Sequence, residues 1–324
     1  MLIITGAAGF IGSALLWKLN SVGLNDILAV DQNAEKTPKW NNLKKHSFKD
    51  YLDSGDFLET LESGKFGKSV QAIFHMGACS DTTETDKNFL NKNNLEYTQR
   101  IAKHCVKNNV YLSYASSAAT YGGGESGFSD DDKLTPKLKP LNLYGQSKLD
   151  FDIWALQNKL EKIIVGFRFF NVYGPNEYHK DHMRSMVHKG FEQARNTGKI
   201  KLFKSYKKEY EDGGQKRDFV YVKDVVDVML WFYDHRDKTG IFNLGQGRAE
   251  SWNELAEAVF KACGKSANIE YVSMPENLKN QYQYFTEADM TKFKKTGCPV
   301  RFQTIFEGAS DYIQNHLLKD DPYL

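Results

Sequence analysis

The stretch Leu2-Ile3-Ile4-Thr5-Gly6-Ala7-Ala8-Gly9-Phe10-Ile11-Gly12 decides the fold of this chain. Its apolar start predicts a buried strand, and the helical spacing of Ile11, Leu15 and Leu19 predicts a helix after the glycines. Glycines at such a turn let the backbone approach a bound group closely. The helix N-terminus presents unpaired N–H groups and a partial positive charge. The stretch therefore predicts a pyrophosphate site and, with it, a bound dinucleotide.

A second apolar run, residues 27–31, ends in a carboxylate, Asp31, about 20 residues beyond the glycines. A carboxylate in that place accepts hydrogen bonds from an adenosine ribose. The spacing Gly-x-x-Gly-x-x-Gly taken alone also fits a tight turn without a ligand. The turn and the carboxylate together favour the dinucleotide.

Composition narrows the function classes. The 43 basic and 41 acidic residues give a net charge of +2, so no global field favours nucleic acid or an anionic membrane. The four cysteines form no Cys-x-x-Cys pair, which argues against a zinc site and a disulfide framework and fits a reducing cytoplasm. His179, His182 and His188 lie close in sequence without a cysteine or carboxylate frame, so we expect no metal site.

No stretch of the chain approaches 18 uninterrupted apolar residues, and the first residues predict a strand rather than an export signal. We therefore expect neither export nor membrane insertion. We expect strands at residues 2–5, 27–31, 72–75, 111–115 and 163–169, with helical stretches between them. This alternation predicts an α/β fold with a Rossmann-type doubly wound parallel sheet.

Beyond Asn171 the pattern loosens. We expect, in chain order, a helix at 186–194, a flexible loop at 206–216, a strand at 218–221, a helix at 224–233, a strand at 241–244 that rejoins the sheet, and helices at 252–262 and 304–317. A chain of 324 residues exceeds one ordinary domain. We expect a dinucleotide-binding domain of residues 1–172 plus 217–247 and a smaller C-terminal α/β substrate domain of residues 173–216 plus 248–324.

Tyr144 and Lys148 are the strongest candidates for chemistry. They stand four residues apart in a predicted helix and so share one face. A lysine ammonium near a tyrosine hydroxyl favours the phenolate, which lowers the tyrosine pKa and makes it a general base. The strand 111–115 delivers Ser117 to the carboxyl edge of the sheet. Its hydroxyl can bind a substrate oxygen that changes between alkoxide and carbonyl, or only satisfy the strand end.

The order of glycine turn, Ser117, Tyr144 and Lys148 resembles that of the extended short-chain dehydrogenases/reductases. Segments along nearly the whole chain resemble the NAD-dependent epimerase/dehydratase family, and within it the epimerases of ADP-heptose: residues 75–80, 114–122, 166–175, 179–180, 216–221 and 242–245. The resemblance implies a cytoplasmic isomerase that supplies heptose for the lipopolysaccharide core. It also implies tightly held NADP with NAD tolerated, an ADP-heptose substrate, and a homo-oligomer such as a pentamer.

The resemblance implies site residues position by position. The catalytic set would be Tyr144, Lys180, Lys148 and Ser117, with Lys180 as a second acid/base. The cofactor would contact Gly6, Gly9, Phe10, Ile11, Gly12, Asp31, Gln32, Lys39, Met76, Gly77, Ala78, Cys79, Ser80, Asn93, Lys148, Val172 and Lys180. The substrate would contact Ser117, Asn171, His182, Lys189, Phe203, Lys204, Ser205, Arg217 and Tyr282.

Several positions depart from the family or have a second interpretation. Met76 stands in place of an acidic residue, and Ser54 in place of a lysine near the adenosine phosphate. Asp31 ordinarily favours NAD, whereas Lys39 can pair with the 2′-phosphate of NADP, and we predict NADP. Arg217 suits a diphosphate, because a guanidinium fork matches its geometry, or is a surface arginine. Arg168, in an apolar strand, fits a structural ion pair and is left unassigned.

Competing functions differ at particular residues. An epimerase of UDP-hexoses at C4 would use Ser117, Tyr144 and Lys148 without Lys180. A nucleotide-sugar 4,6-dehydratase would carry an Asp-Glu pair at residues 118–119, where two alanines stand. A non-catalytic dinucleotide sensor would not need the base.

Overall fold

The computed structural model describes residues 1–279 and 282–324. At its centre lies a seven-stranded sheet in the order β3-β2-β1-β4-β5-β6-β10, in which every neighbouring pair is parallel. The strands are β1 Leu2–Thr5, β2 Ile27–Asp31, β3 Asp50–Asp53, β4 Ala72–His75, β5 Tyr111–Ser117, β6 Val165–Phe169 and β10 Gly240–Leu244. The chain reverses its direction of winding between β1 and β4, which confirms the doubly wound parallel sheet.

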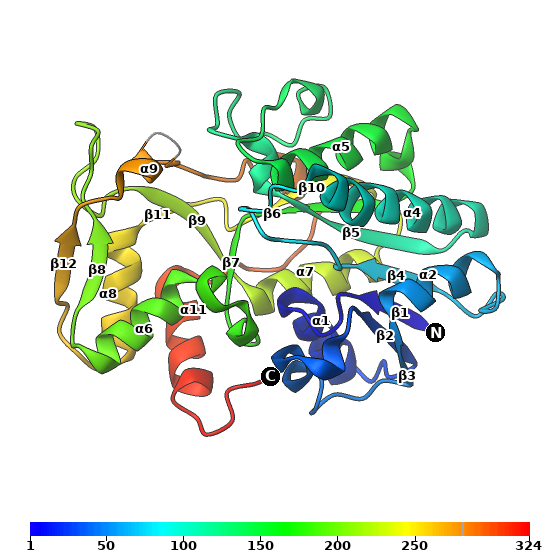
Figure 1. Ribbon diagram of the computed structural model, residues 1–324, viewed down its shortest axis with the longest axis horizontal. Coiled ribbons are helices and arrows are strands. Elements are labelled where there is room, and N and C mark those ends of the chain that lie inside the picture. The colour runs from blue at the N-terminus through cyan, green and yellow to red at the C-terminus, as the bar shows by residue number, and fades with distance from the viewer. Residues whose placement is uncertain (280–281) are drawn as a thin grey trace.

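Helices cover both faces of this sheet (Figure 1). On one face lie α1 (Phe10–Ser21) and α7 (Val222–Asp234), packed against one set of strand side chains. On the other lie α2 (Ser54–Glu62), α4 (Tyr97–Asn108) and α5 (Leu143–Gln157). Successive strand residues point to opposite faces of the sheet. Ile4 therefore belongs to the apolar core under α1 and α7, and Ile3 to the core on the other face.

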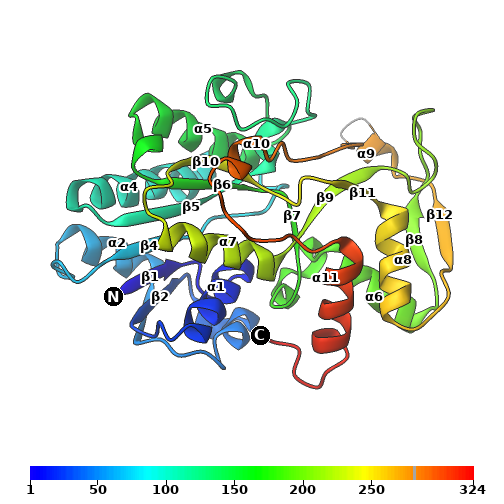
Figure 2. The same cartoon turned by 180° about the vertical axis from the view of Figure 1, so that it is seen from behind.

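A second group of elements lies to one side of the central sheet (Figures 1 and 2). It has a three-stranded sheet in the order β11-β9-β7 and the pair β12-β8, covered by α6, α8 and α11. Their bounds are β7 Asn171–Tyr173, β8 Ile200–Phe203, β9 Lys216–Tyr221, β11 Ala249–Ser251, β12 Ile269–Val272, α6 Met186–Asn196, α8 Trp252–Ala262 and α11 Ile305–Tyr312. These elements share a third apolar core. The boundaries expected for the dinucleotide-binding domain and the substrate domain stay a prediction.

Short helical elements occupy the connections. The α-helical ones are α3 Lys87–Leu90, α9 Glu276–Lys279 and α10 Thr291–Lys294. The 3-10 turns are η1 Ala34–Lys36, η2 Pro38–Asn42, η4 Ala118–Tyr121, η5 Thr135–Lys137, η6 Leu160–Lys162 and η7 Tyr178–Met183. Two π-helical turns are η3 Asn91–Glu96 and η8 Ile313–Leu317.

Most predicted elements are confirmed, several to the residue. The strands at 2–5, 27–31 and 72–75 and the helix at 252–262 have the predicted bounds, and β10 joins the edge of the sheet as expected. Two expectations need correction. The loop predicted at 206–216 ends one residue early, because Lys216 opens β9 and pairs with Ser251. The helix predicted at 304–317 changes from α-helix to a π-helical turn at Ile313.

Candidate active site

A cleft of about 1000 Å³ opens at the carboxyl edge of the central sheet, where the direction of winding reverses. This is the place where doubly wound sheets hold ligands. The ends of β1, β2, β5 and β6 line it, together with segments 76–83 and 179–187. All residues that sequence reasoning assigned to the cofactor and to catalysis line this cleft.

The glycine turn leaves no room for side chains. Gly6 has φ +65°, and a Cβ on it would lie 2.7 Å from the backbone of Gly77. A Cβ on Gly12 would lie 2.0 Å from the carbonyl oxygen of Gly6. Helix α1 begins at Phe10 with no side chain capping its N-terminus and no acidic residue in its first turn. This backbone cradle and its uncapped N–H groups fit the pyrophosphate of a dinucleotide.

Asp31 is buried at the end of β2 and is held in place by the backbone. One carboxylate oxygen accepts a hydrogen bond from Ala8 N at 2.9 Å, and the other accepts one from Gln32 N at 2.8 Å. Lys39 Nζ lies 3.6 Å from Asp31 Oδ1 and is partly exposed. A carboxylate for a ribose and a cation for a phosphate therefore stand side by side.

Asn94 is a supporting residue that sequence reasoning missed. It is buried in η3, its Oδ1 accepts a hydrogen bond from Cys79 N at 2.9 Å, and its Nδ2 donates to Cys79 O at 3.0 Å. Nδ2 also lies 3.0 Å from Ser147 Oγ on α5. One amide thus fixes the segment after β4 to the helix that carries Tyr144, and a long-range contact of this kind leaves no local pattern in the sequence.

Helix α5 starts beside the cleft because Asn142 caps it, accepting a hydrogen bond from Gly145 N. Lys148 Nζ donates to the carbonyl oxygen of Ala115 on β5 at 2.9 Å. Burial lowers the pKa of Lys148 to about 8, and the nearby carboxylate of Asp152 opposes this shift. The amine is thereby fixed against the strand that ends in Ser117.

The expected lowering of the Tyr144 pKa by Lys148 stays a prediction, and burial acts against it. Burial raises the pKa of Tyr144, and the main opposing influence is a hydrogen bond with Ser117 rather than the lysine ammonium. The reason is geometric, since Lys148 Nζ is turned toward the strand carbonyl of Ala115. Tyr144 and Ser117 both line the cleft, and Lys148 is anchored to β5 beside them.

Arg168 is fully buried and belongs to a structural network, as its ion-pair interpretation predicted. Its Nε lies 2.9 Å from Asp152 Oδ2, and its other nitrogens donate to Tyr121 Oη and Thr135 Oγ1. Asp152 also accepts from Ser116 Oγ at 2.9 Å. Because Asp152 lies one helical turn beyond Lys148, this network supports the floor of the cleft.

Lys180 lines the same cleft from another element, the turn η7 that follows β7. Its Nζ lies 5.4 Å from the ring centroid of Phe10 at the glycine turn, a cation–π distance. Burial lowers the pKa of Lys180, while the carboxylate of Glu177 opposes the shift. A depressed pKa makes a lysine a better proton acceptor near neutral pH.

The residues assigned to the substrate divide into two groups. Ser117, Asn171 and His182 line the cleft. The others do not line it: Lys189, Phe203, Lys204, Ser205, Arg217 and Tyr282. Lys189 donates a hydrogen bond to the carbonyl oxygen of His182 and so supports one wall.

Arg217 connects the second group to the cleft through Trp252. Its guanidinium lies 5.7 Å from the ring of Trp252, which lines the cleft, and 5.4 Å from the ring of Tyr282. Trp252 Nε1 donates to Tyr282 Oη at 2.9 Å. Burial lowers the pKa of Arg217. No acidic side chain pairs with Arg217 in the part of the chain that the structure describes, so a buried cation beside the cleft has only neutral partners.

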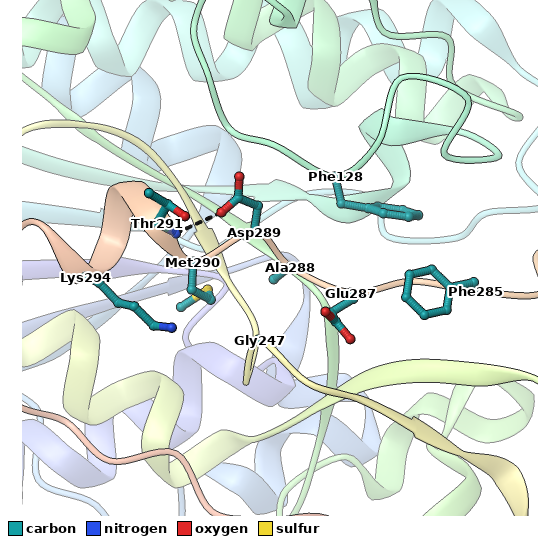
Figure 3. Close-up of a pocket in the computed structure, with 9 residues that line it drawn as sticks. All are labelled: Phe128, Gly247, Phe285, Glu287, Ala288, Asp289, Met290, Thr291 and Lys294. Atoms are coloured by element: carbon teal, nitrogen blue, oxygen red, sulfur yellow. Dashed lines mark hydrogen bonds between the residues drawn. The ribbon is translucent and has the colours of Figure 1, made fainter.

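A second hollow, of about 350 Å³, shares no lining residue with the cleft (Figure 3). Its lining includes Phe128, Gly247, Phe285 and Lys294.

Within residues 1–279 and 282–324, no group of three or more histidine, cysteine or acidic side chains is arranged to hold a metal ion. Among the same residues, no helix has the length and apolar character needed to cross a bilayer.

Comparisons with known proteins agree with this architecture. Relatives named ADP-L-glycero-D-manno-heptose-6-epimerase include one from Nitratidesulfovibrio vulgaris (strain DP4), 48% identical over 324 residues and all of both chains. Another, from Fusobacterium nucleatum, is 46% identical over all of both chains. A solved structure of the Helicobacter pylori protein of that name has a TM-score of 0.77 and 26% identity, covering 97% of this chain and 95% of its own.

A further solved structure, MoeE5 in complex with UDP-glucuronic acid and NAD, has a TM-score of 0.73 and 27% identity, with 97% of each chain covered. The sequence model of the NAD dependent epimerase/dehydratase family matches residues 2–245. With three quarters of its length matched and a dinucleotide cradle at the switch point of its sheet, this chain belongs to the NAD dependent epimerase/dehydratase family.

Proposed function

We propose that this chain is an epimerase that converts ADP-D-glycero-D-manno-heptose to its L-glycero epimer by inverting C6″. The observation that carries the proposal is that two groups able to exchange protons, Tyr144 on α5 and Lys180 on η7, enter one cleft from different elements beside a dinucleotide cradle. The full-length relatives of this name support the substrate. In the cell, such an enzyme supplies heptose for the lipopolysaccharide core from the cytoplasm.

Inversion of a carbinol carbon without an acidifying neighbour requires hydride chemistry. When bound, the nicotinamide supplies the acceptor and then the donor of that hydride. Tyr144 takes the hydroxyl proton in one C6″ configuration and Lys180 takes it in the other, because one base cannot reach both faces equally well. Ser117 holds the oxygen between alkoxide and carbonyl, and Lys148 stays anchored to β5 beside them.

The substrate diphosphate is assigned to Arg217. A buried guanidinium without an acidic partner gains most from a ligand that brings negative charge, and its fork suits a diphosphate. Phe203, whose ring lies 6.1 Å from that of Tyr282, and the neighbouring Lys204 and Ser205 extend this side of the site. Asn171 and His182 line the cleft, and Lys189 supports its wall by donating a hydrogen bond to the carbonyl oxygen of His182.

We assign NADP as the cofactor, with NAD tolerated. Asp31 and Lys39 meet at the end of β2, so the carboxylate suits the ribose and the ammonium suits a 2′-phosphate. The assembly is proposed to be a homo-oligomer, a pentamer in the simplest case.

The decisive experiment is incubation of the purified chain with ADP-D-glycero-D-manno-heptose, followed by NMR of the product. We expect the L-glycero epimer without net reduction or oxidation of the bound cofactor. Lys180→Met should retain the cofactor and lose epimerisation, whereas Lys201→Met, an exposed lysine on β8, should behave like the parent protein. Turnover of UDP-glucose at C4, unchanged by Lys180→Met, would instead assign the C4 epimerase. Bound NADP with no sugar turned over would assign a dinucleotide sensor.

A further inference from the structure

The loop that carries Lys180 begins at Asn176, a fully buried side chain. Asn176 has φ +75°, in the left-handed region that asparagine tolerates better than most residues. Its Nδ2 donates to Ser13 Oγ on α1 at 3.0 Å, and its Oδ1 accepts from the backbone N–H of Leu324 at 3.0 Å. One amide therefore joins the glycine-turn helix to Leu324, which lies 148 residues from Asn176 in the sequence.

Asn42, also buried, makes a second connection between the same parts. Its Nδ2 lies 3.1 Å from Asn176 O and 2.8 Å from Ala8 O in the glycine turn. It also lies 3.2 Å from His179 Nδ1. Both the start and the middle of the Lys180 loop are thus tied to the backbone that forms the cofactor cradle.

The segment Pro322–Leu324, here called the strap, crosses from η8 to this loop. In Figures 1 and 2 the end marked C lies beside the first elements of the chain. Tyr178 Oη donates to Pro322 O at 2.7 Å, the rings of Tyr178 and Tyr323 lie 5.1 Å apart, and Leu324 is buried in the core that contains α1. Lys45 Nζ donates to Tyr323 O at 3.0 Å from the other side.

The far end of the loop is closed by Glu177. Its two carboxylate oxygens accept hydrogen bonds from Ser185 N and Ser185 Oγ, both at 2.6 Å. Between these anchors Asp181 has φ +45°, a strained conformation for a residue with a side chain. Strain of this kind persists only where surrounding contacts enforce it. The carbonyl oxygen of Asp181 accepts hydrogen bonds from Arg184 N at 3.3 Å and Arg184 Nε at 2.9 Å, and the strap and Asn176 hold the start of the same loop.

We propose that Asn176 and the strap act together as a positioning device for Lys180, fixing its amine relative to the cofactor cradle. The proposal rests on the proposed function, in which Lys180 serves one of the two C6″ configurations. Neither Asn176 nor the strap lines the cleft. Their loss should therefore slow the step that uses Lys180 and spare the step that uses Tyr144.

Two variants perturb the device from opposite sides. Asn176→Gly removes the side-chain contacts while tolerating a positive φ. Deletion of residues 322–324 removes the strap. Asn109→Gly is the matched control, because Asn109 also has a positive φ, +54°, but caps the exposed end of α4. Each variant is loaded with NADP and mixed with each of the two ADP-heptose epimers, and the absorbance of the transiently reduced nicotinamide gives the rate of each half-reaction.

We expect both variants to retain bound NADP and a KM near that of the parent. With one epimer the half-reaction should slow about 100-fold, the scale of a misplacement of the order of 1 Å, and with the other it should change little. The combined variant should lose no more than either alone, because the two changes remove one device. Asn109→Gly should match the parent.

The ratio of the two half-reaction rates separates positioning from general damage. A parent-like ratio in either variant, with both rates lowered equally or neither lowered, overturns the proposal. Lys180→Met in the same series tests the proposed function itself. If it leaves both half-reactions intact, the two-base function fails; if it abolishes one half-reaction while Asn176→Gly and the deletion do not change the ratio, only the positioning proposal fails.

Discussion

Asp152→Asn tests whether the buried network under the cleft supports both stability and chemistry. Asp152 and Arg168 are fully buried, with 2.9 Å between the carboxylate Oδ2 and the guanidinium Nε. Asparagine keeps nearly the same shape but removes the charge, which leaves Arg168 buried without its counter-charge. Breaking a buried ion pair from one side costs about 3–5 kcal/mol, and we expect the free energy of unfolding to fall by that amount.

A double-mutant cycle isolates the pair. Arg168→Met alone should be costly as well, because it leaves Asp152 charged in the core. The combination of Asp152→Asn with Arg168→Met removes both charges, so its loss of stability should be smaller than the sum of the two single losses by about 2 kcal/mol or more. Urea unfolding followed by circular dichroism measures each value. A loss below about 1 kcal/mol for Asp152→Asn would refute the reasoning.

The same substitution should move the pH profile of turnover. The carboxylate of Asp152 raises the pKa of Lys148, which burial has lowered to about 8. Without that carboxylate the pKa falls further, so Lys148 loses its proton at a lower pH. If the ammonium form is the working form, activity is lost as pH rises through this pKa, and the alkaline limb of kcat should move toward neutral pH. A limb that moves to higher pH would contradict this assignment.

Two further predictions follow from single contacts. Gly12→Ala should fold but lose affinity for its cofactor. The added Cβ would lie 2.0 Å from the Gly6 carbonyl oxygen and would force the cradle open. Fluorescence titration with NADPH measures the loss of affinity, and binding as tight as in the parent would show that the turn can adjust. Asp224 has a pKa raised by burial to about 6, so its contribution to stability is present below pH 4 and is lost as pH rises through 6. The stability of the parent relative to Asp224→Asn should therefore fall by about 2 kcal/mol between pH 4 and pH 7, measured by denaturant unfolding at each pH. A constant difference would show that the carboxyl does not titrate above its ordinary range.

The central sheet could be predicted from sequence because its strands are short apolar runs at regular intervals. Residues 27–31 are buried throughout, as a strand covered on both faces must be. Strand β3, Asp50–Asp53, was missed because it forms the edge of the sheet and is half exposed, so two aspartates flank its only apolar pair. An edge strand of this composition has no buried run to reveal it.

The cleft residues could be predicted where chemistry follows strand ends or helical spacing. Arg168 carried a signal as well, because a buried arginine requires a buried counter-charge, yet no local pattern identified Asp152 as that partner. Asn94 and Asn176 carried no signal. Their roles depend on contacts with residues far away in the sequence. Without those contacts, a single asparagine is typical of a turn and indicates nothing more.

The two proposed bases differ in how the fold secures them. Tyr144 lies on a fifteen-residue helix with an asparagine cap, so one continuous hydrogen-bonded element sets its position. Lys180 lies on a strained turn whose position depends on contacts from α1, η2 and the strap. Because elements held by a few distant contacts open at lower free energy than a packed helix, the Lys180 side is the first to lose its geometry under mild destabilisation. The position of one proposed base is therefore fixed by local structure, and the position of the other by contacts between parts of the chain that are distant in sequence.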